Sequence, residues 1–372
     1  MGAQAFAGRI LAPDGARHGS VTVEGGRIAA IAAAASDKPR PAAWIAPGFI
    51  DLQVNGAFGV DLATEPERVG ELAARLPATG VTGFLPTLIS APAERFERWA
   101  ERIRAASPPP GAARVLGLHL EGPFLSPERP GAHDASFIRA ADDDCFERMV
   151  ALPGLRLVTI APERPDGLAR IARLVARGVA VSLGHTAADH DQMRAGFDAG
   201  ARLVTHVFNA MTGFDHRRPG ALGAALVDPR AVLGLIADGV HVHPAAVELA
   251  VRAAGPARIA LVTDAMAAAG MGPGRAELAG RPVEVDDTSA RLSDGTLAGS
   301  ILTLDRAVRN MAVWSRLGAE AALRMATEVP ARALGLASGG ALAVGAAADL
   351  VLLDDELQVI ATYVAGELAY ER

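Results

Sequence analysis

The sequence predicts an α/β protein: a (β/α)8 TIM-type barrel with a small β-sandwich domain formed by both chain termini. Three observations support this fold class. Short apolar segments alternate with amphipathic ones through the middle of the chain, both ends carry closely spaced β-like segments, and polar side chains follow most of the apolar segments. We expect residues 47–338 to form the barrel, and residues 1–46 and 339–372 to form the two parts of the small domain.

The barrel prediction rests on eight apolar segments of strand length. They are residues 48–52, 83–86, 115–120, 155–160, 180–183, 203–207, 232–236 and 259–262. Helical patterns lie between most of them, including residues 92–106, 167–177 and 244–254. A doubly wound parallel sheet would show the same alternation, but a count of eight favours the barrel.

The prediction of the small domain rests on β-like segments near both termini. Residues 9–11, 20–23 and 27–31 are separated by Asp-Gly and Gly-Gly turns, and residues 348–353 and 359–364 repeat the pattern at the other end. Because these segments flank one long middle region, we expect both ends of the chain to join in a single domain.

The composition excludes several classes of protein. Half of the 372 residues are hydrophobic, which supports a large packed core, and a net charge of −6 without a basic stripe argues against nucleic acid or an anionic membrane as a partner. The N-terminus lacks the pattern of a secretory signal, and no apolar run is long enough to span a membrane, so we expect a cytoplasmic protein.

Cysteine usage limits the chemistry further. Cys145 is the only cysteine, so a disulfide within the chain and a cysteine-rich zinc site are both excluded. It follows a run of three aspartates, which indicates the start of an acidic-capped helix and a structural role. Any bound metal must therefore use histidine and carboxylate ligands.

Residues able to bind metal stand at the ends of three predicted strands. Glu121, His185 and His206 would meet at one mouth of a barrel, because barrel active sites lie at the C-terminal ends of the strands. Two imidazoles and one carboxylate suit zinc and leave a position for water or substrate. Ligand type alone leaves iron(II), cobalt(II) and manganese(II) open. We expect one divalent ion per chain, with zinc as the first candidate.

Asp264 follows the last predicted strand and would reach the same mouth. A carboxylate there can take a proton from water and return it to a leaving amine, as a general base and then a general acid. An aspartate that merely caps a turn is the alternative. His119 shares a strand face with Glu121, and we expect it either to support the residues around the metal site or to pack in the core.

Several motifs resemble those of the N-acetylglucosamine-6-phosphate deacetylases, within the amidohydrolase superfamily. They occur in order along nearly the whole chain: residues 47–56 (PGFIDLQVNG), 119–124 (HLEGPF), 184–186 (GHT), 205–211 (THVFNAM), 237–241 (ADGVH) and 262–265 (VTDA). The resemblance implies deacetylation of N-acetyl-D-glucosamine 6-phosphate in amino-sugar catabolism. It also implies that Glu121, His185 and His206 are the metal ligands and that Asp264 is the general base.

The resemblance further implies which positions bind the phosphorylated sugar. They are Ala132, His133, Asn209, Ala210, Arg217, His241, Ile301, Leu302 and Thr303. By the same comparison, His133 contacts the sugar and the reacting amide, whereas Asn209 and Ala210 contact the phosphate through the backbone. Arg217 binds the phosphate with its side chain. The resemblance also implies a homodimer, or alternatively a tetramer. His241 would then bind substrate in its own subunit or in a neighbouring one.

Two departures from related sequences have consequences. Many amidohydrolases carry His-x-His on the first strand for a second metal, but here those positions are Gln53 and Asn55. Amides are poor zinc ligands beside available imidazoles, so we expect a single metal. Arg218 stands where the family often has Glu, and it either strengthens phosphate binding or faces solvent.

Three alternative functions remain open. A dihydroorotase or an N-acyl-amino-acid deacylase usually carries the missing first-strand histidine pair. An N-acetylgalactosamine-6-phosphate deacetylase would differ only in one sugar hydroxyl. A non-catalytic, amidohydrolase-like assembly protein should have lost a ligand or the base, whereas Glu121, His185, His206 and Asp264 are all present.

Overall fold

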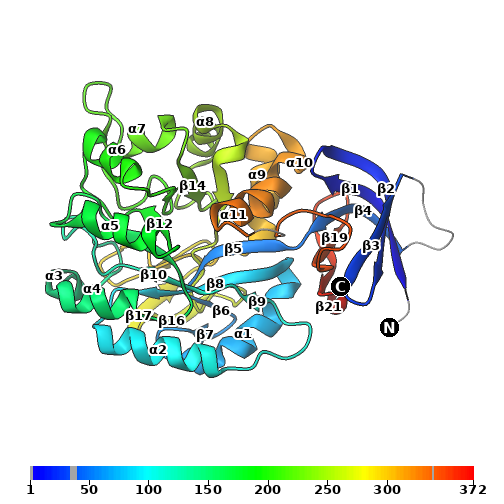
Figure 1. Ribbon diagram of the computed structural model, residues 1–372, viewed down its shortest axis with the longest axis horizontal. Helices are drawn as coiled ribbons and strands as arrows, with labels where there is room; N and C mark the ends of the chain where they lie inside the picture. Colours follow the sequence, from blue (N-terminus) through cyan, green and yellow to red (C-terminus); the bar gives the residue numbers. More distant parts are fainter. Residues whose placement is uncertain (1–2, 34–39, 337–338) are drawn as a thin grey trace.

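The computed structural model describes residues 3–33, 40–336 and 339–372. A nearly closed barrel of parallel strands lies beside a separate sheet that both termini build (Figure 1). The predicted fold class is therefore confirmed. The predicted boundary between residues 338 and 339 adjoins residues outside the described part of the chain.

The barrel strands follow one another around the sheet in the order of the sequence. Within the described residues they are β5 (Phe49–Val54), β8 (Val81–Ile89), β10 (Leu118–Glu121), β11 (Leu155–Ile160), β12 (Ala180–Leu183), β13 (Leu203–Val204), β14 (Val232–Leu235) and β15 (Ile259–Leu261). Each lies in or overlaps one of the eight segments predicted from the sequence. A short strand, β9 (Arg114–Val115), adds to β8.

The first and last strands, β5 and β15, meet where the barrel closes. An isolated bridge joins Val54 to Ala265, and the backbone N–H of Asn55 donates to the carbonyl of Ala265 over 2.9 Å. Just before this bridge, the buried carboxylate of Asp51 accepts bonds from the backbone N–H (3.2 Å) and the hydroxyl (2.6 Å) of Thr263. Side-chain and backbone bonds together therefore close the barrel.

Helices surround the barrel (Figure 1). Those that the structure describes are α1 (Val69–Arg75), α2 (Ala93–Ala105), α3 (Ala135–Ala140), α4 (Asp143–Val150), α5 (Gly167–Ala176), α6 (His190–Asp198), α7 (Gly220–Val227), α8 (Pro244–Ala254), α9 (Leu304–Trp314), α10 (Gly318–Ala326) and α11 (Glu328–Ala333), with the 3-10 turns η1 (Pro66–Arg68), η2 (Leu76–Thr79) and η3 (Pro256–Arg258). The helical stretches predicted from the sequence correspond to α2, α5 and α8.

Individual helices show the expected amphipathic and capping features. In α2, Phe96, Trp99 and Ile103 recur at helical spacing and are buried. Cys145 is buried in α4, where its backbone N–H donates to the capping carboxylate of Asp142, and burial raises the pKa of its thiol to about 11. These features support the structural role predicted for Cys145. Among the described residues, no helix has the length and apolar character needed to cross a membrane.

Both termini contribute to one sheet, as predicted. Its order is β21 (Glu367–Glu371), β20 (Val359–Val364), β19 (Leu350–Leu353), β4 (Arg40–Pro47), β1 (Gln4–Ala12), β2 (Gly15–Glu24) and β3 (Arg27–Ala32). The rings of Phe6 on β1 and Tyr363 on β20 lie 4.8 Å apart although two strands separate β1 from β20. The sheet therefore folds over a shared apolar core, as in a sandwich.

The sequence did not predict a small β-rich insertion between β15 and α9. It contains an antiparallel sheet of β16 (Gly274–Leu278), β17 (Arg281–Val285) and β18 (Ala290–Arg291). A separate pair of short strands, β6 (Gly56–Ala57) and β7 (Val60–Asp61), follows β5. Leu278 and Val283 pack with Met266 in a separate apolar cluster. The guanidinium of Arg281 donates to the carbonyl of Ala132 over 2.6 Å, which ties the insertion to a loop at the barrel mouth.

We expect Asp51→Asn to change how stability depends on pH. Burial raises the pKa of Asp51 from 3.8 to about 7, against hydrogen bonds from Thr263 and Gln53 that lower it. The folded protein therefore binds this proton more tightly than the unfolded chain does. This proton therefore stabilises the folded state. Its contribution is present in full below the pKa of Asp51 in the unfolded chain, and it is lost as pH rises through the raised pKa of Asp51 in the folded protein.

An asparagine can keep both contacts with Thr263 without carrying a charge. Asp51→Asn should therefore melt near the wild-type temperature at about pH 4.5 and above it at about pH 8. Differential scanning calorimetry at the two pH values measures this difference. If the difference in melting temperature between the variant and wild type were the same at both pH values, the raised pKa of Asp51 would be contradicted.

Candidate active site

A cavity of about 350 Å³ opens at the C-terminal ends of the barrel strands. It brings together the four residues that the sequence singled out for chemistry: Glu121 at the end of β10, His185 after β12, His206 after β13 and Asp264 after β15. The parallel strands place these distant positions at one mouth, as the barrel prediction requires.

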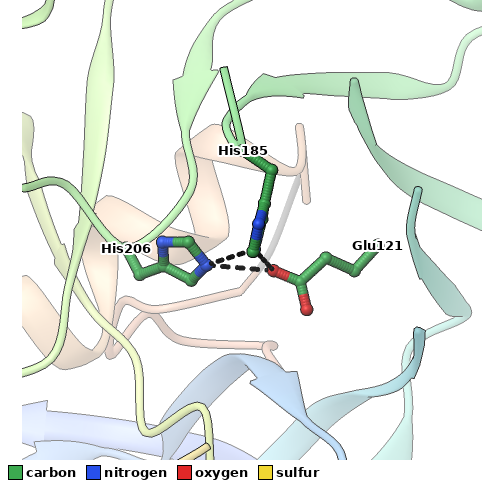
Figure 2. Close-up of side chains that lie close together, drawn as sticks. All are labelled: Glu121, His185 and His206. Atoms are coloured by element: carbon green, nitrogen blue, oxygen red, sulfur yellow. Dashed lines mark hydrogen bonds and ion pairs between the residues drawn. The ribbon is translucent and has the colours of Figure 1, made fainter. Parts of the chain in front are cut away.

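Glu121, His185 and His206 point at one another from three different strands (Figure 2). The Nε2 atoms of the two histidines lie 3.0 Å apart, and they lie 3.2 and 3.0 Å from Oε1 of Glu121. Ligands of a tetrahedral zinc ion at about 2.0–2.1 Å would lie roughly 3.3 Å from one another. The spacing and chemistry of these three buried donors fit a divalent metal ion.

The surroundings of the histidines support this fit. Nδ1 of His185 lies 2.9 Å from the carbonyl of Arg129, which can only accept, so Nδ1 carries the proton and Nε2 is left as a lone-pair donor. Burial raises the pKa of Glu121, but its close contacts with His133, His185 and His206 outweigh this effect and hold the pKa well below its usual range. The carboxylate therefore stays ionised and attracts a cation.

Three of these residues have a backbone conformation that L-amino acids rarely adopt. The φ angles of His185, His206 and Asp264 are 46°, 26° and 49°. Each such residue costs on the order of 1–3 kcal/mol and persists where the surrounding structure enforces it. The backbone N–H of Ser300, for example, donates to the carbonyl of Asp264 over 2.7 Å.

A similar contact supports the turn that follows His185. Glu163 accepts hydrogen bonds from the hydroxyl of Thr186 (2.5 Å) and the backbone N–H of Ala187 (2.7 Å). Short loops bonded in this way turn the functional side chains from the strand ends into the cavity.

Asp264 has the electrostatic character expected of a general base. Burial and the negative charge of Glu121 raise its pKa to about 6. Its Oδ1 accepts hydrogen bonds from the side-chain amides of Gln53 (3.0 Å) and Asn55 (2.7 Å). A carboxylate with this pKa can take and return a proton near neutral pH.

His133 is a neutral hydrogen-bond donor in this environment. Burial lowers its pKa to about 4, and the neighbouring His185 contributes to this shift. Its Nδ1 accepts the backbone N–H of Ser90 over 3.2 Å, so its proton is on Nε2, which lies 3.7 Å from Oε2 of Glu121. An N–H in that position can donate to an oxygen held beside the three donors.

His119 makes its hydrogen bonds away from the three donors, which agrees with a supporting or packing role. Its Nε2 lies 2.9 Å from the hydroxyl of Thr159, and its Nδ1 lies 3.2 Å from the hydroxyl of Thr87 and from the carbonyl of Leu52. Burial lowers its pKa to about 4, so the ring is neutral.

Five of the predicted substrate-binding residues line the cavity: Ala132, His133, Asn209, Ala210 and His241. Nδ1 of His241 lies 2.6 Å from the carboxylate of Asp238. Burial raises the pKa of Asp238, but the bond from His241 and other contacts outweigh this effect and lower the pKa overall. An ionised Asp238 therefore holds His241 so that its Nε2 is available to a ligand.

The other predicted substrate-binding residues do not line this cavity. Arg217 and its neighbour Arg218 are exposed on the loop before α7, where their backbone N–H groups donate to Asp215 over 3.0 and 3.3 Å. Ile301, Leu302 and Thr303 lie after the β-rich insertion, and Leu302 is buried in the barrel core. A single chain therefore does not bring Arg217 to the cavity.

Several lining residues were not predicted from the sequence. Glu128, Arg129 and Pro130 come from the loop after β10, and Leu278, Thr296, Leu297 and Gly299 come from the region of the β-rich insertion. None of them stands in a recognisable motif. The long interval between the last predicted strand and the next helix could have indicated a covering segment.

Comparisons with known proteins identify related chains over the same length. The sequence profile of the amidohydrolase family matches residues 44–369. Human N-acetylglucosamine-6-phosphate deacetylase is 45% identical over 345 residues, which cover 88% of this chain and 83% of the human protein. The N-acetylgalactosamine-6-phosphate deacetylase of Escherichia coli O157:H7 is 41% identical over 338 residues, which cover 89% of each.

A solved structure agrees with the fold along nearly the entire chain. It is a mutant N-acetyl-D-glucosamine-6-phosphate deacetylase from Mycobacterium smegmatis, in complex with N-acetyl-D-glucosamine 6-phosphate. It matches with a TM-score of 0.92 and 36% sequence identity, and the match covers 99% of this chain and 100% of the other.

We expect the purified protein to bind one equivalent of Zn²⁺ at the three donors. His206→Ala removes one donor and should weaken zinc binding by at least roughly 100-fold, because even residues that only support a ligand contribute about 10–100-fold. Isothermal titration calorimetry with elemental analysis measures both values. His190→Ala, at a histidine beside Asp191 outside the cavity, is the matched control. Two equivalents in wild type, or unchanged affinity in His206→Ala, would refute the assignment.

Proposed function

The chain belongs to the amidohydrolase family and, within it, to the N-acetylglucosamine-6-phosphate deacetylases, and on this basis we propose its reaction. It hydrolyses N-acetyl-D-glucosamine 6-phosphate to D-glucosamine 6-phosphate and acetate. The observation that carries the proposal is the convergence of Glu121, His185, His206 and Asp264 in one cavity. The similarity to deacetylases along the whole chain supports it.

Glu121, His185 and His206 would hold one divalent ion, with zinc as the first candidate. When bound, the ion polarises the acetyl carbonyl and lowers the pKa of the attacking water. Gln53 and Asn55 replace the histidines that could hold a second ion, so a single ion is proposed.

Asp264 moves the protons of the reaction. As the new C–O bond forms between water and the acetyl carbon, the carboxylate takes one proton of the water. The C–N bond then breaks, and Asp264 returns the proton to the departing nitrogen, which leaves acetate and the free amine. Nε2–H of His133 donates a hydrogen bond to the carbonyl oxygen as negative charge develops on it.

The same cavity would bind the sugar phosphate. Asn209, Ala210 and His241 line it, and the bond from Nδ1 of His241 to Asp238 leaves its Nε2 for a ligand. Because Arg217 lies outside its own cavity, we propose that it reaches the phosphate of a neighbouring subunit in a homodimer. Phe214, on the same loop as Arg217, and Val227, at the C-terminal end of α7, are 62% and 68% exposed and offer apolar side chains for such a contact. A sugar phosphate is an intracellular metabolite, so a cytoplasmic enzyme is proposed.

The galactosamine epimer is the second candidate substrate. The similarity to the Escherichia coli O157:H7 N-acetylgalactosamine-6-phosphate deacetylase favours testing it, because the two sugars differ only in the orientation of one hydroxyl. A non-catalytic function is disfavoured because all four chemical residues converge in the cavity.

The direct test measures acetate release from both 6-phosphorylated N-acetylhexosamines and from unphosphorylated N-acetylglucosamine. We expect the glucosamine phosphate to give the highest kcat/KM, a chelator to abolish activity and added zinc to restore it. Removal of the phosphate should lower kcat/KM by at least roughly 100-fold, because remote binding energy positions the amide. Equal activity without the phosphate would rule out the proposed substrate class.

Asp264→Asn separates metal binding from chemistry. The amide keeps the size of the side chain but cannot take a proton, so kcat should fall roughly 10²–10⁴-fold while the zinc content stays at the wild-type value. Asp287→Asn changes an exposed aspartate in the same way and serves as the control. Wild-type acetate release by Asp264→Asn would show that another group is the base.

A further inference from the structure

We propose that Gln53 and Asn55 are positioning residues that fix the orientation of the general base and leave Oδ2 of Asp264 as its working oxygen. The inference rests on the proposed function for the role of Asp264. The two amides, which stand where a second metal site would need histidines, would thus bind the base instead of a metal.

Two amide donors converge on one oxygen of Asp264. Nδ2 of Asn55 and Nε2 of Gln53 lie 2.7 and 3.0 Å from Oδ1, and both side chains are buried, with 5% and 2% exposure. Among the described residues, no donor reaches Oδ2. Because Asp264 lines the cavity, Oδ2 is the oxygen left for water and substrate.

Gln53 also ties the base to the metal site. The same Nε2 lies 3.1 Å from Oε1 of Glu121, the oxygen shared with His185 and His206. An amide NH₂ has two N–H groups, so Gln53 can donate to Glu121 and Asp264 at once. Its neutral bridge between two carboxylates sets the distance from the base to the site of the metal.

The orientation of Asn55 follows from the same chemistry. Because an ionised carboxylate only accepts, Nδ2 must face Asp264, and this turns Oδ1 of Asn55 the other way. That Oδ1 is buried and has no hydrogen-bond partner among the described residues. An unpaired buried acceptor costs about 1–3 kcal/mol, so this orientation is held at a cost by the bond from Nδ2 to Asp264.

The positions of the two amides explain how they reach the base. Residues two apart on a strand share a face, so Gln53 and Asn55 both face the barrel interior. The bonds that close the barrel, from the backbone of Asn55 to Ala265 and from Asp51 to Thr263, bring this end of β5 against the end of β15.

The test compares wild type with Asn55→Leu and Gln53→Met, which keep similar volumes without an amide donor. Asn55→Asp is a further variant that preserves shape but places a second carboxylate beside Asp264. We expect kcat to fall roughly 10–100-fold with KM within a few-fold of wild type and one zinc per chain. Gln358→Met, in the turn between β19 and β20, removes an amide far along the chain from the barrel strands and should change nothing.

Combining each variant with Asp264→Asn shows whether the amides act through the base. In that background we expect no further loss, because the group that they position is already inactive. Crystal structures of Asn55→Leu and Gln53→Met should show the Asp264 carboxylate turned from its wild-type orientation, whether or not turnover is measured.

Several outcomes would overturn the inference. They are wild-type kcat in the single variants, an equal loss in the Asp264→Asn background, loss of zinc, or an unmoved carboxylate. Failure of the proposed function is distinguishable, because wild type itself would then release no acetate from the phosphorylated N-acetylhexosamines.

Discussion

The closure of the barrel between β5 and β15 is the contact on which the site depends. There the side chain of Asp51 joins the two strands where backbone hydrogen bonds would otherwise do so. Its carboxylate accepts hydrogen bonds from the backbone N–H and the hydroxyl of Thr263. Asp264 follows Thr263 directly, and Gln53 and Asn55 follow Asp51 on the opposite side of the closure. Any separation of the two strands would therefore move Asp264 away from Gln53 and Asn55, which donate hydrogen bonds to it. The burial of Asp51, which raises its pKa, is tolerated at the position that closes the barrel.

Backbone strain at the strand ends is a second consequence of this arrangement. His185, His206 and Asp264 leave their strands in a left-handed conformation, which aims each side chain into the cavity. The strain persists because short loops carry hydrogen bonds that alternative conformations would lose, such as those from Thr186 and Ala187 to Glu163. The site is therefore held by its supporting loops as well as by its strands.

Sequence reasoning succeeded where local patterns decide structure. All eight barrel strands were predicted because buried strands are short and apolar, and Glu121, His185, His206 and Asp264 were predicted to meet because parallel strands end at one mouth. The β-rich insertion was missed because its strands are short and mostly exposed, with Leu278 as the one buried residue of β16. The partners of Gln53 were missed for another reason, since Asp264 lies 211 positions away along the chain.

The charges of the cavity agree with the single metal ion that we propose. Glu121 and Asp264 contribute two negative charges, which one divalent cation balances, and the histidines are neutral as ligands. Two further imidazoles with a second dication would leave the cavity strongly positive beside the base and would depress the pKa that Asp264 needs to take a proton. Neutral amides at positions 53 and 55 hold the same carboxylates in place without adding charge.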